Sequence, residues 1–302
     1  MHMIAPIREI WAFILAIAER MDKTHMTLIA AGVAFYAMFA VFPGLTALIA
    51  FWGIWYDPNV IQDFVDVAED FVPPEAMAIL QSQVDELVSG GRTQLGWTTF
   101  LSFMIATIAA RAGVNALVQG LNAAYGVRSH STVFGFVLAY VLTLAIVGIV
   151  FAGLVTIVVV PIVLNLFAIG PFRAWLLTAL PWAGMLLIVM VGIGILYRYG
   201  PNVRSPRTAI FTWGSVVATI AWGLASLAFS AYVNSFNSYN RIYGSIGAVV
   251  ALLMWFYLAA FSVMLGAVVN VEIRRRRRIS AARAARRQAR EAEPDQDGSG
   301  PV

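Results

Sequence analysis

Residues 242–278 carry the sequence IYGSIGAVVALLMWFYLAAFSVMLGAVVNVEIRRRRR, in which a long apolar run stops at five consecutive arginines. A helix needs about 20 predominantly apolar residues to cross a bilayer, and the run over residues 242–273 exceeds that length. Arginines that directly follow a spanning helix are typical of its cytoplasmic end. This stretch therefore predicts a transmembrane helix whose C-terminal end lies in the cytoplasm.

Five further apolar stretches precede this one. They cover residues 27–56, 95–125, 133–167, 175–197 and 209–236. Only 12% of the 302 residues are charged and 60% are hydrophobic, whereas soluble domains usually carry about 25% charged residues. We therefore predict an all-α, polytopic membrane protein with six transmembrane helices over residues 27–273.

Two segments outside the apolar stretches predict further helices. Residues 1–26 form an N-terminal amphipathic helix, with Trp11, Ile14 and Leu15 on an apolar face and charged residues opposite. It either lies in the membrane interface or packs on the cytoplasmic rim of the bundle, and the pattern fits both. Residues 57–94 predict a helical cap of two short amphipathic helices on the periplasmic side, separated by Pro73-Pro74.

The distribution of basic residues predicts the orientation. With both termini in the cytoplasm, the inner segments hold most of the 20 lysines and arginines, as the positive-inside rule requires. The tail over residues 274–302 is basic at first and then has a disordered composition. We expect its arginines to bind anionic headgroups of membrane lipids. No nucleic acid is expected, because no aromatic or fold signal accompanies the charge.

A polar stripe in the second predicted span is the candidate binding site. Arg111, Asn115, Gln119 and Asn122 recur at helical spacing on one face. A charge at this depth is unfavourable by at least about 2.5–3.5 kcal/mol, so Arg111 needs a partner or a watery cavity. The functional interpretation is that the stripe binds an anionic substrate. The structural alternative is that Arg111 pairs with backbone carbonyls or polar side chains and holds helices together.

Small residues near the ends of the first and last spans predict helix packing. Such residues let helix backbones approach closely in lipid. We assign this role to Gly32, Tyr36, Pro43, Tyr243, Gly244 and Gly247. The chain has no cysteine and three scattered histidines, so we expect no metal, no cofactor and no enzymatic activity.

Several of these stretches together resemble the YihY/BrkB family of bacterial inner-membrane proteins, once labelled ribonuclease BN. The matching segments are residues 31–43, Arg111 with residues 121–127, residues 197–202, and residues 243–248 with the positions that follow up to Asn270. The resemblance implies a six-helix fold and a location in the inner (plasma) membrane. The family often has Gly-Ala-Glu where this chain has Gly266-Ala267-Val268, so we expect no role for a carboxylate at this position.

Three functions remain as hypotheses. The first is a transporter or flippase for an anionic amphiphile or lipid of the cell envelope, based on Arg111 and its stripe. The alternative is a non-transporting membrane scaffold. Either function is compatible with a homo-oligomer. The third is the tRNA-processing ribonuclease of the old family label. The scattered histidines argue against it, because a metal-dependent nuclease needs converging ligands.

Overall fold

The computed structural model describes residues 4–55, 81, 92–129, 131–166, 173–203, 209–235 and 245–292, and all regular structure in these residues is helical. The helices are α1 (Ile4–Lys23), α2 (Met26–Trp55), α5 (Arg92–Tyr125), α6 (Thr132–Leu166), α7 (Arg173–Tyr199), α8 (Trp213–Ser235) and α10 (Ser245–Ala292). Six of them, α2 to α10, are long and apolar enough to cross a membrane. The predicted all-α class with six spans is thereby confirmed. The predicted cap over residues 57–94 lies outside the described residues, apart from Gln81 and the start of α5.

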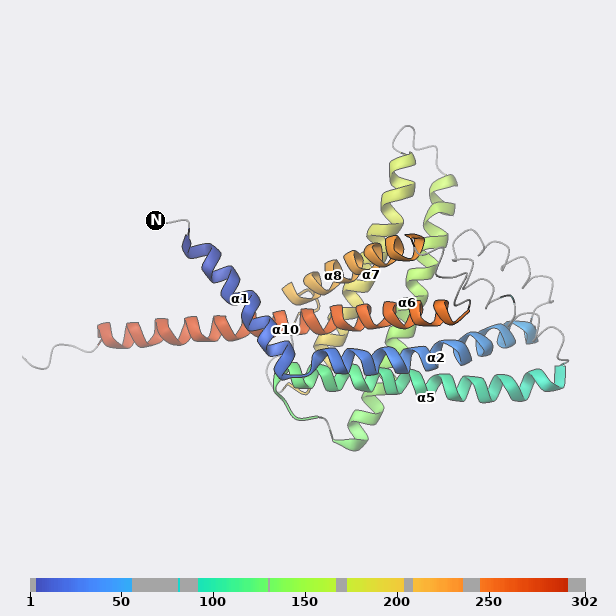
Figure 1. The fold of residues 1–302 in the computed structure, drawn as a ribbon, viewed down its shortest axis with the longest axis horizontal. Helices are drawn as coiled ribbons and strands as arrows, with labels where there is room; N and C mark the ends of the chain where they lie inside the picture. Colours follow the sequence, from blue (N-terminus) through green and yellow to red (C-terminus); the bar gives the residue numbers. More distant parts are fainter. Residues whose placement is uncertain are drawn as a thin grey trace, which may run out of the picture.

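The spans are arranged as one group of helices crossed by a pair. α2, α5 and α10 lie alongside one another, and α8 packs on α10 (Figure 1). α6 and α7 form an antiparallel pair that runs across this group, contacting α5 and α8. α1 is joined to the start of α2, runs at an angle to it and packs against α10.

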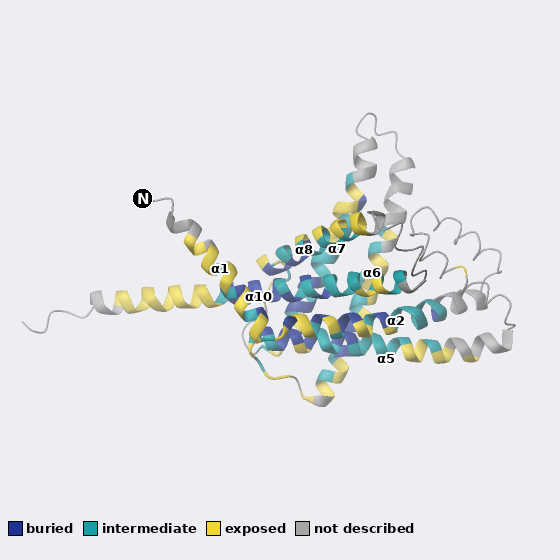
Figure 2. Ribbon diagram, viewed as in Figure 1, coloured by how far each residue is buried: buried dark blue, intermediate teal, exposed yellow. Residues whose placement is uncertain are grey.

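The buried core lies at one end of the bundle. Dark blue residues concentrate in the halves of α2, α5 and α10 that lie nearest α1 (Figure 2). At this end α2 begins, α5 and α7 end, and α8 begins; we call it the basic end, because Arg20, Arg128 and Arg274 lie there. Met26, Leu121 and Met264 are fully buried in it. The basic end is therefore where the tertiary structure fixes side chains most tightly.

The outside of the bundle is apolar. Leu28, Val133 and Leu144 each expose more than seven-tenths of their surface, and they belong to a large set of exposed aliphatic and aromatic residues on every span. A monomeric protein in water rarely exposes contiguous apolar patches on this scale. The exposed residues are those expected to face lipid.

The last helix extends beyond residue 273, where the apolar stretch ends. α10 continues without a break through the arginine run to Ala292, and residues 275–288 are exposed. Alanine and arginine have among the highest intrinsic helix propensities, so the helix outlasts the apolar segment. The described part of the basic tail is thus a helical extension that projects from the basic end (Figure 1).

Candidate functional site

Arg111 lies where α5 crosses α6 and is half-buried. The centre of its guanidinium is 4.0 Å from the ring centroid of Phe136 and 5.4 Å from that of Tyr140. Its buried Nε has no hydrogen-bond partner among the described residues. An aromatic ring contacts the flat face of a guanidinium, whereas anions bind its N–H edge. The aromatic contact therefore stabilises the cation and leaves the Nε–H available to donate a hydrogen bond.

The aromatic side of the crossing is partly exposed. Phe136 exposes 48% of its surface, and Tyr140 is half-buried. Nothing in the sequence pattern singles out these two rings, because aromatic residues near the end of a span also form the interfacial belt.

The other members of the stripe lie in different surroundings. Asn115 is half-buried and Gln119 is exposed, whereas Asn122 is buried. Asn122 Oδ1 accepts a hydrogen bond of 2.8 Å from the backbone N–H of Asn202, in the segment after α7. Asn202 in turn donates from Nδ2 to the backbone oxygen of Arg128 at 3.2 Å. The four residues share one face of α5, but Asn122 ties chain segments at the basic end, about 16 Å along the helix from Arg111.

A second polar cluster caps α8 at the basic end. Asn270 Oδ1 accepts from the backbone N–H of Gly214 at 2.8 Å, and its Nδ2 donates to Thr212 Oγ1 at 2.9 Å. Thr212 and Ser215 hydrogen-bond reciprocally, each accepting at its side-chain oxygen from the other's backbone N–H. This is a capping box with serine in the third position. The side chain of Asn270 therefore fixes the start of α8 to α10.

Replacing Asn270 with leucine is expected to destabilise the protein by about 1–3 kcal/mol, because a buried donor at Gly214 loses its partner. Asn270→Asp is expected to be milder, since a carboxylate can still accept from Gly214 and from the Thr212 hydroxyl. Thermal unfolding in detergent measures both. Equal stability of the two variants would contradict this account of the cap.

α8 and α10 touch backbone to backbone beside that cap. A Cβ added at Gly266 would lie 2.3 Å from the Gly214 carbonyl oxygen and 2.7 Å from Ala218 Cβ. The Tyr197 hydroxyl donates to the Val263 backbone oxygen in the same region. Ala267 and Val268 are fully buried, so the position at which the family resemblance leads us to expect a carboxylate faces the protein core in this chain.

The residues predicted to serve helix packing have unequal surroundings. Ala30 and Ala34 of the first span are buried, whereas a Cβ added at Gly32 would meet nothing within 4 Å. α2 and α5 instead come close at two glycines of α5: an added Cβ would lie 3.4 Å from Tyr36 Cβ at Gly113 and 3.0 Å from Ile29 Cγ2 at Gly120. Pro43 lies inside the continuous helix α2, and Gly247 is half-buried. Tyr243 and Gly244 lie outside the described residues.

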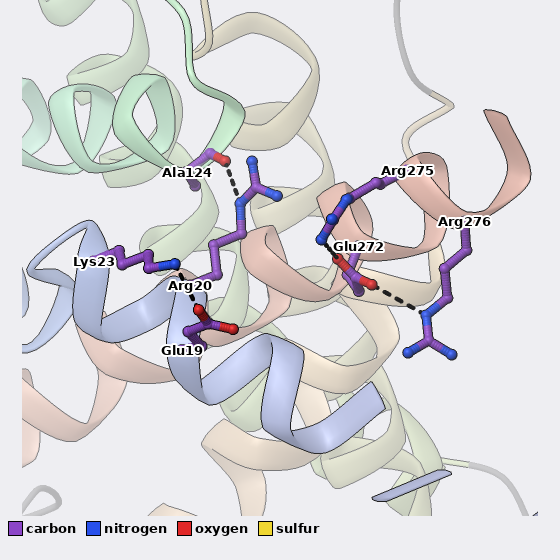
Figure 3. A network of polar contacts seen from close by, with 7 residues as sticks. All are labelled: Glu19, Arg20, Lys23, Ala124, Glu272, Arg275 and Arg276. Atoms are coloured by element: carbon purple, nitrogen blue, oxygen red, sulfur yellow. Dashed lines mark hydrogen bonds and ion pairs between the residues drawn. The ribbon is translucent and has the colours of Figure 1, made fainter. Parts of the chain in front are cut away.

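At the basic end a hydrogen bond joins α1 to α5, and ion pairs form within α10. Arg20 Nε donates to the backbone oxygen of Ala124, the penultimate residue of α5, at 3.2 Å (Figure 3). Glu272 is buried, and its carboxylate pairs with Arg276 at 3.1 Å and Arg275 at 3.5 Å. Within the part of the chain that the structure describes, no group of three or more His, Asp or Glu residues is placed to hold a metal ion.

The chain is similar to a protein family and to several known proteins along most of its length. The family model described as virulence factor BrkB matches residues 17–293. The ribonuclease-like protein YfkH of Bacillus subtilis is 29% identical over 256 residues, which cover 82% of this chain and 90% of that protein. A UPF0761 membrane protein of Vibrio parahaemolyticus is 27% identical over 270 residues, covering 87% of this chain and 82% of its own length. No solved structure matches the chain.

Proposed function

The chain belongs to the virulence factor BrkB family, whose model matches residues 17–293, and from this premise we propose that this membrane protein moves an anionic amphiphile of the cell envelope across the bilayer. The observation that carries the proposal is the guanidinium of Arg111. It lies within a membrane span, has aromatic rings on its face, and keeps a buried N–H donor without a partner among the described residues. A phosphate or carboxylate headgroup is the complementary ligand.

The proposal places the protein in the bacterial inner membrane with the basic end in the cytoplasm. Support for this orientation comes from Arg20, Lys23, Arg128 and the arginines that follow Ile273, because loops rich in lysine and arginine stay on the cytoplasmic side. The first arginines of the α10 extension would then bind anionic headgroups of the inner leaflet. The substrate would reach Arg111 from the lipid phase, past the exposed ring of Phe136.

A non-transporting scaffold is the competing function. The dense packing at the basic end favours it, since Leu121, Met264 and Val268 are fully buried there. The name of YfkH suggests a ribonuclease, but that name describes the relative. The residues described in this chain bring no cluster of metal-ligating side chains together to support such chemistry.

Reconstitution into liposomes tests the proposal. Fluorescent phosphatidylglycerol in the inner leaflet is expected to become accessible to a membrane-impermeant quencher faster in vesicles that contain the protein than in empty vesicles. Fluorescent phosphatidylcholine serves as the zwitterionic control and is expected to move more slowly. Equal rates in protein-containing and empty vesicles for the anionic lipid would favour the scaffold.

A further inference from the structure

α1 has three faces: one packs against the bundle, one is charged and exposed, and one is apolar and exposed. Successive residues are turned by 100° around a helix, which places Phe13, Ile17 and Met21 on one side. Ile17 and Met21 are buried in the core, and Phe13 packs against it. Arg8, Glu19 and Lys23 lie on a second, exposed side, where the Lys23 ammonium lowers the pKa of the Glu19 carboxyl by hydrogen bonding and charge.

The third face is apolar and uncovered. Trp11, Ile14 and Leu15 expose 62%, 48% and 52% of their surfaces. These residues lie outside the six spans, so the lipid-facing surface of the bundle does not account for them. We call Trp11, Ile14 and Leu15 the outer face of α1.

The outer face is held in a fixed position at the basic end. A two-residue turn, in which His25 has a φ of 51°, joins α1 to α2. Arg20 donates to the end of α5, and the guanidinium of Arg276 lies 4.8 Å from the ring centroid of Phe13. α1 is therefore bound to α5 and α10 at the level where the apolar spans stop and the arginine run begins.

We propose that the outer face of α1 inserts into the anionic headgroup region of the membrane in which the bundle sits. Charge complementarity identifies the occupant. The outer face lies on a helix whose neighbour carries the exposed Arg275, Arg277 and Arg278, and apolar insertion beside a basic cluster binds anionic lipid. Tryptophan with aliphatic residues at this level is typical of an interfacial helix. The proposal depends on the membrane topology and is independent of whether the protein transports a substrate.

The absence of cysteine from the chain makes the test direct. Leu15→Cys places a spin label on the outer face, and Ala12→Cys places one on the charged side of the same helix, where Ala12 is exposed. The full-length variants are placed in nanodiscs that contain phosphatidylglycerol. The label at residue 15 is expected to be several-fold less accessible to a water-soluble nickel complex, and several-fold more accessible to oxygen, than the label at residue 12.

Three outcomes would overturn the proposal. The first is equal nickel accessibility at residues 12 and 15 in the anionic nanodiscs. The second is protection of residue 15 that is as strong in nanodiscs of phosphatidylcholine alone, which would remove the role of anionic headgroups. The third is protection that persists in detergent with a short label-to-label distance between two copies, which would identify a second copy of the chain as the occupant. Both substituted residues are exposed, so the fold is expected to survive, and thermal unfolding checks this.

Discussion

Replacing Gly266 with leucine is expected to prevent the protein from reaching its folded state. Even the first side-chain atom would lie 2.3 Å from the Gly214 carbonyl oxygen and 2.5 Å from the Tyr197 hydroxyl. The backbone of α8 cannot move away without separating α8 from α10, and the buried Tyr197 cannot move away without losing its hydrogen bond to Val263 of α10. Over-packing in a core usually destabilises by about 1–3 kcal/mol, and we expect a larger loss here because backbone atoms are in the way.

Gly148 provides the matched control for Gly266→Leu. It lies in the α6 span and is exposed, and a Cβ added there would meet nothing within 4 Å. Gly148→Leu is therefore expected to leave stability within about 0.5 kcal/mol of the parent protein. Size-exclusion profiles and thermal unfolding in detergent distinguish the two variants. A Gly266→Leu protein that is monodisperse and as stable as Gly148→Leu would show that α8 and α10 do not meet at this glycine.

The order of the helices could be predicted from the sequence because it depends on local properties. The sequence predicts the second span over residues 95–125, and α5 covers Arg92–Tyr125. Apolar length and turn residues decide such elements with little tertiary information. The last helix shows the limit of this reasoning. Hydropathy changes sharply at residue 273, but the backbone hydrogen bonds of α10 continue to Ala292 because the polar residues that follow are good helix formers.

The contacts of the candidate site could not be predicted in the same way. The sequence identifies Arg111 as a charge within a span, but it does not show that Phe136 and Tyr140 of α6 lie against its guanidinium. Similarly, the sequence draws attention to Gly266 through the family resemblance, but nothing in it distinguishes Gly214 from any other glycine at the start of a helix or shows that the two meet. Pairings of this kind arise from crossings between helices that are distant in the sequence, and no local periodicity encodes them.

Arg111→Met is expected to abolish translocation of the anionic lipid while the protein remains folded and inserted. Methionine has a similar reach and is apolar, so it can pack against Phe136 and Tyr140. Among the described residues, no charged partner of Arg111 is left unpaired by the substitution. Hydrogen bonds to charged groups contribute about 1.5–3 kcal/mol each, and 1.4 kcal/mol is a factor of ten. If the guanidinium donates two such hydrogen bonds to the headgroup, their loss lowers the rate by more than about 100-fold.

Two further variants separate the role of the guanidinium edge from that of charge alone. Arg111→Lys keeps the positive charge but lacks the planar fork of donors, so an intermediate rate is expected. Arg128→Met removes an exposed arginine at the basic end and is expected to translocate phosphatidylglycerol at the rate of the parent protein. The quenching assay in liposomes measures all three rates, and thermal unfolding verifies that each variant is folded. If Arg111→Met is folded and as active as Arg128→Met, Arg111 does not bind the substrate, and its contacts with α6 serve helix packing alone.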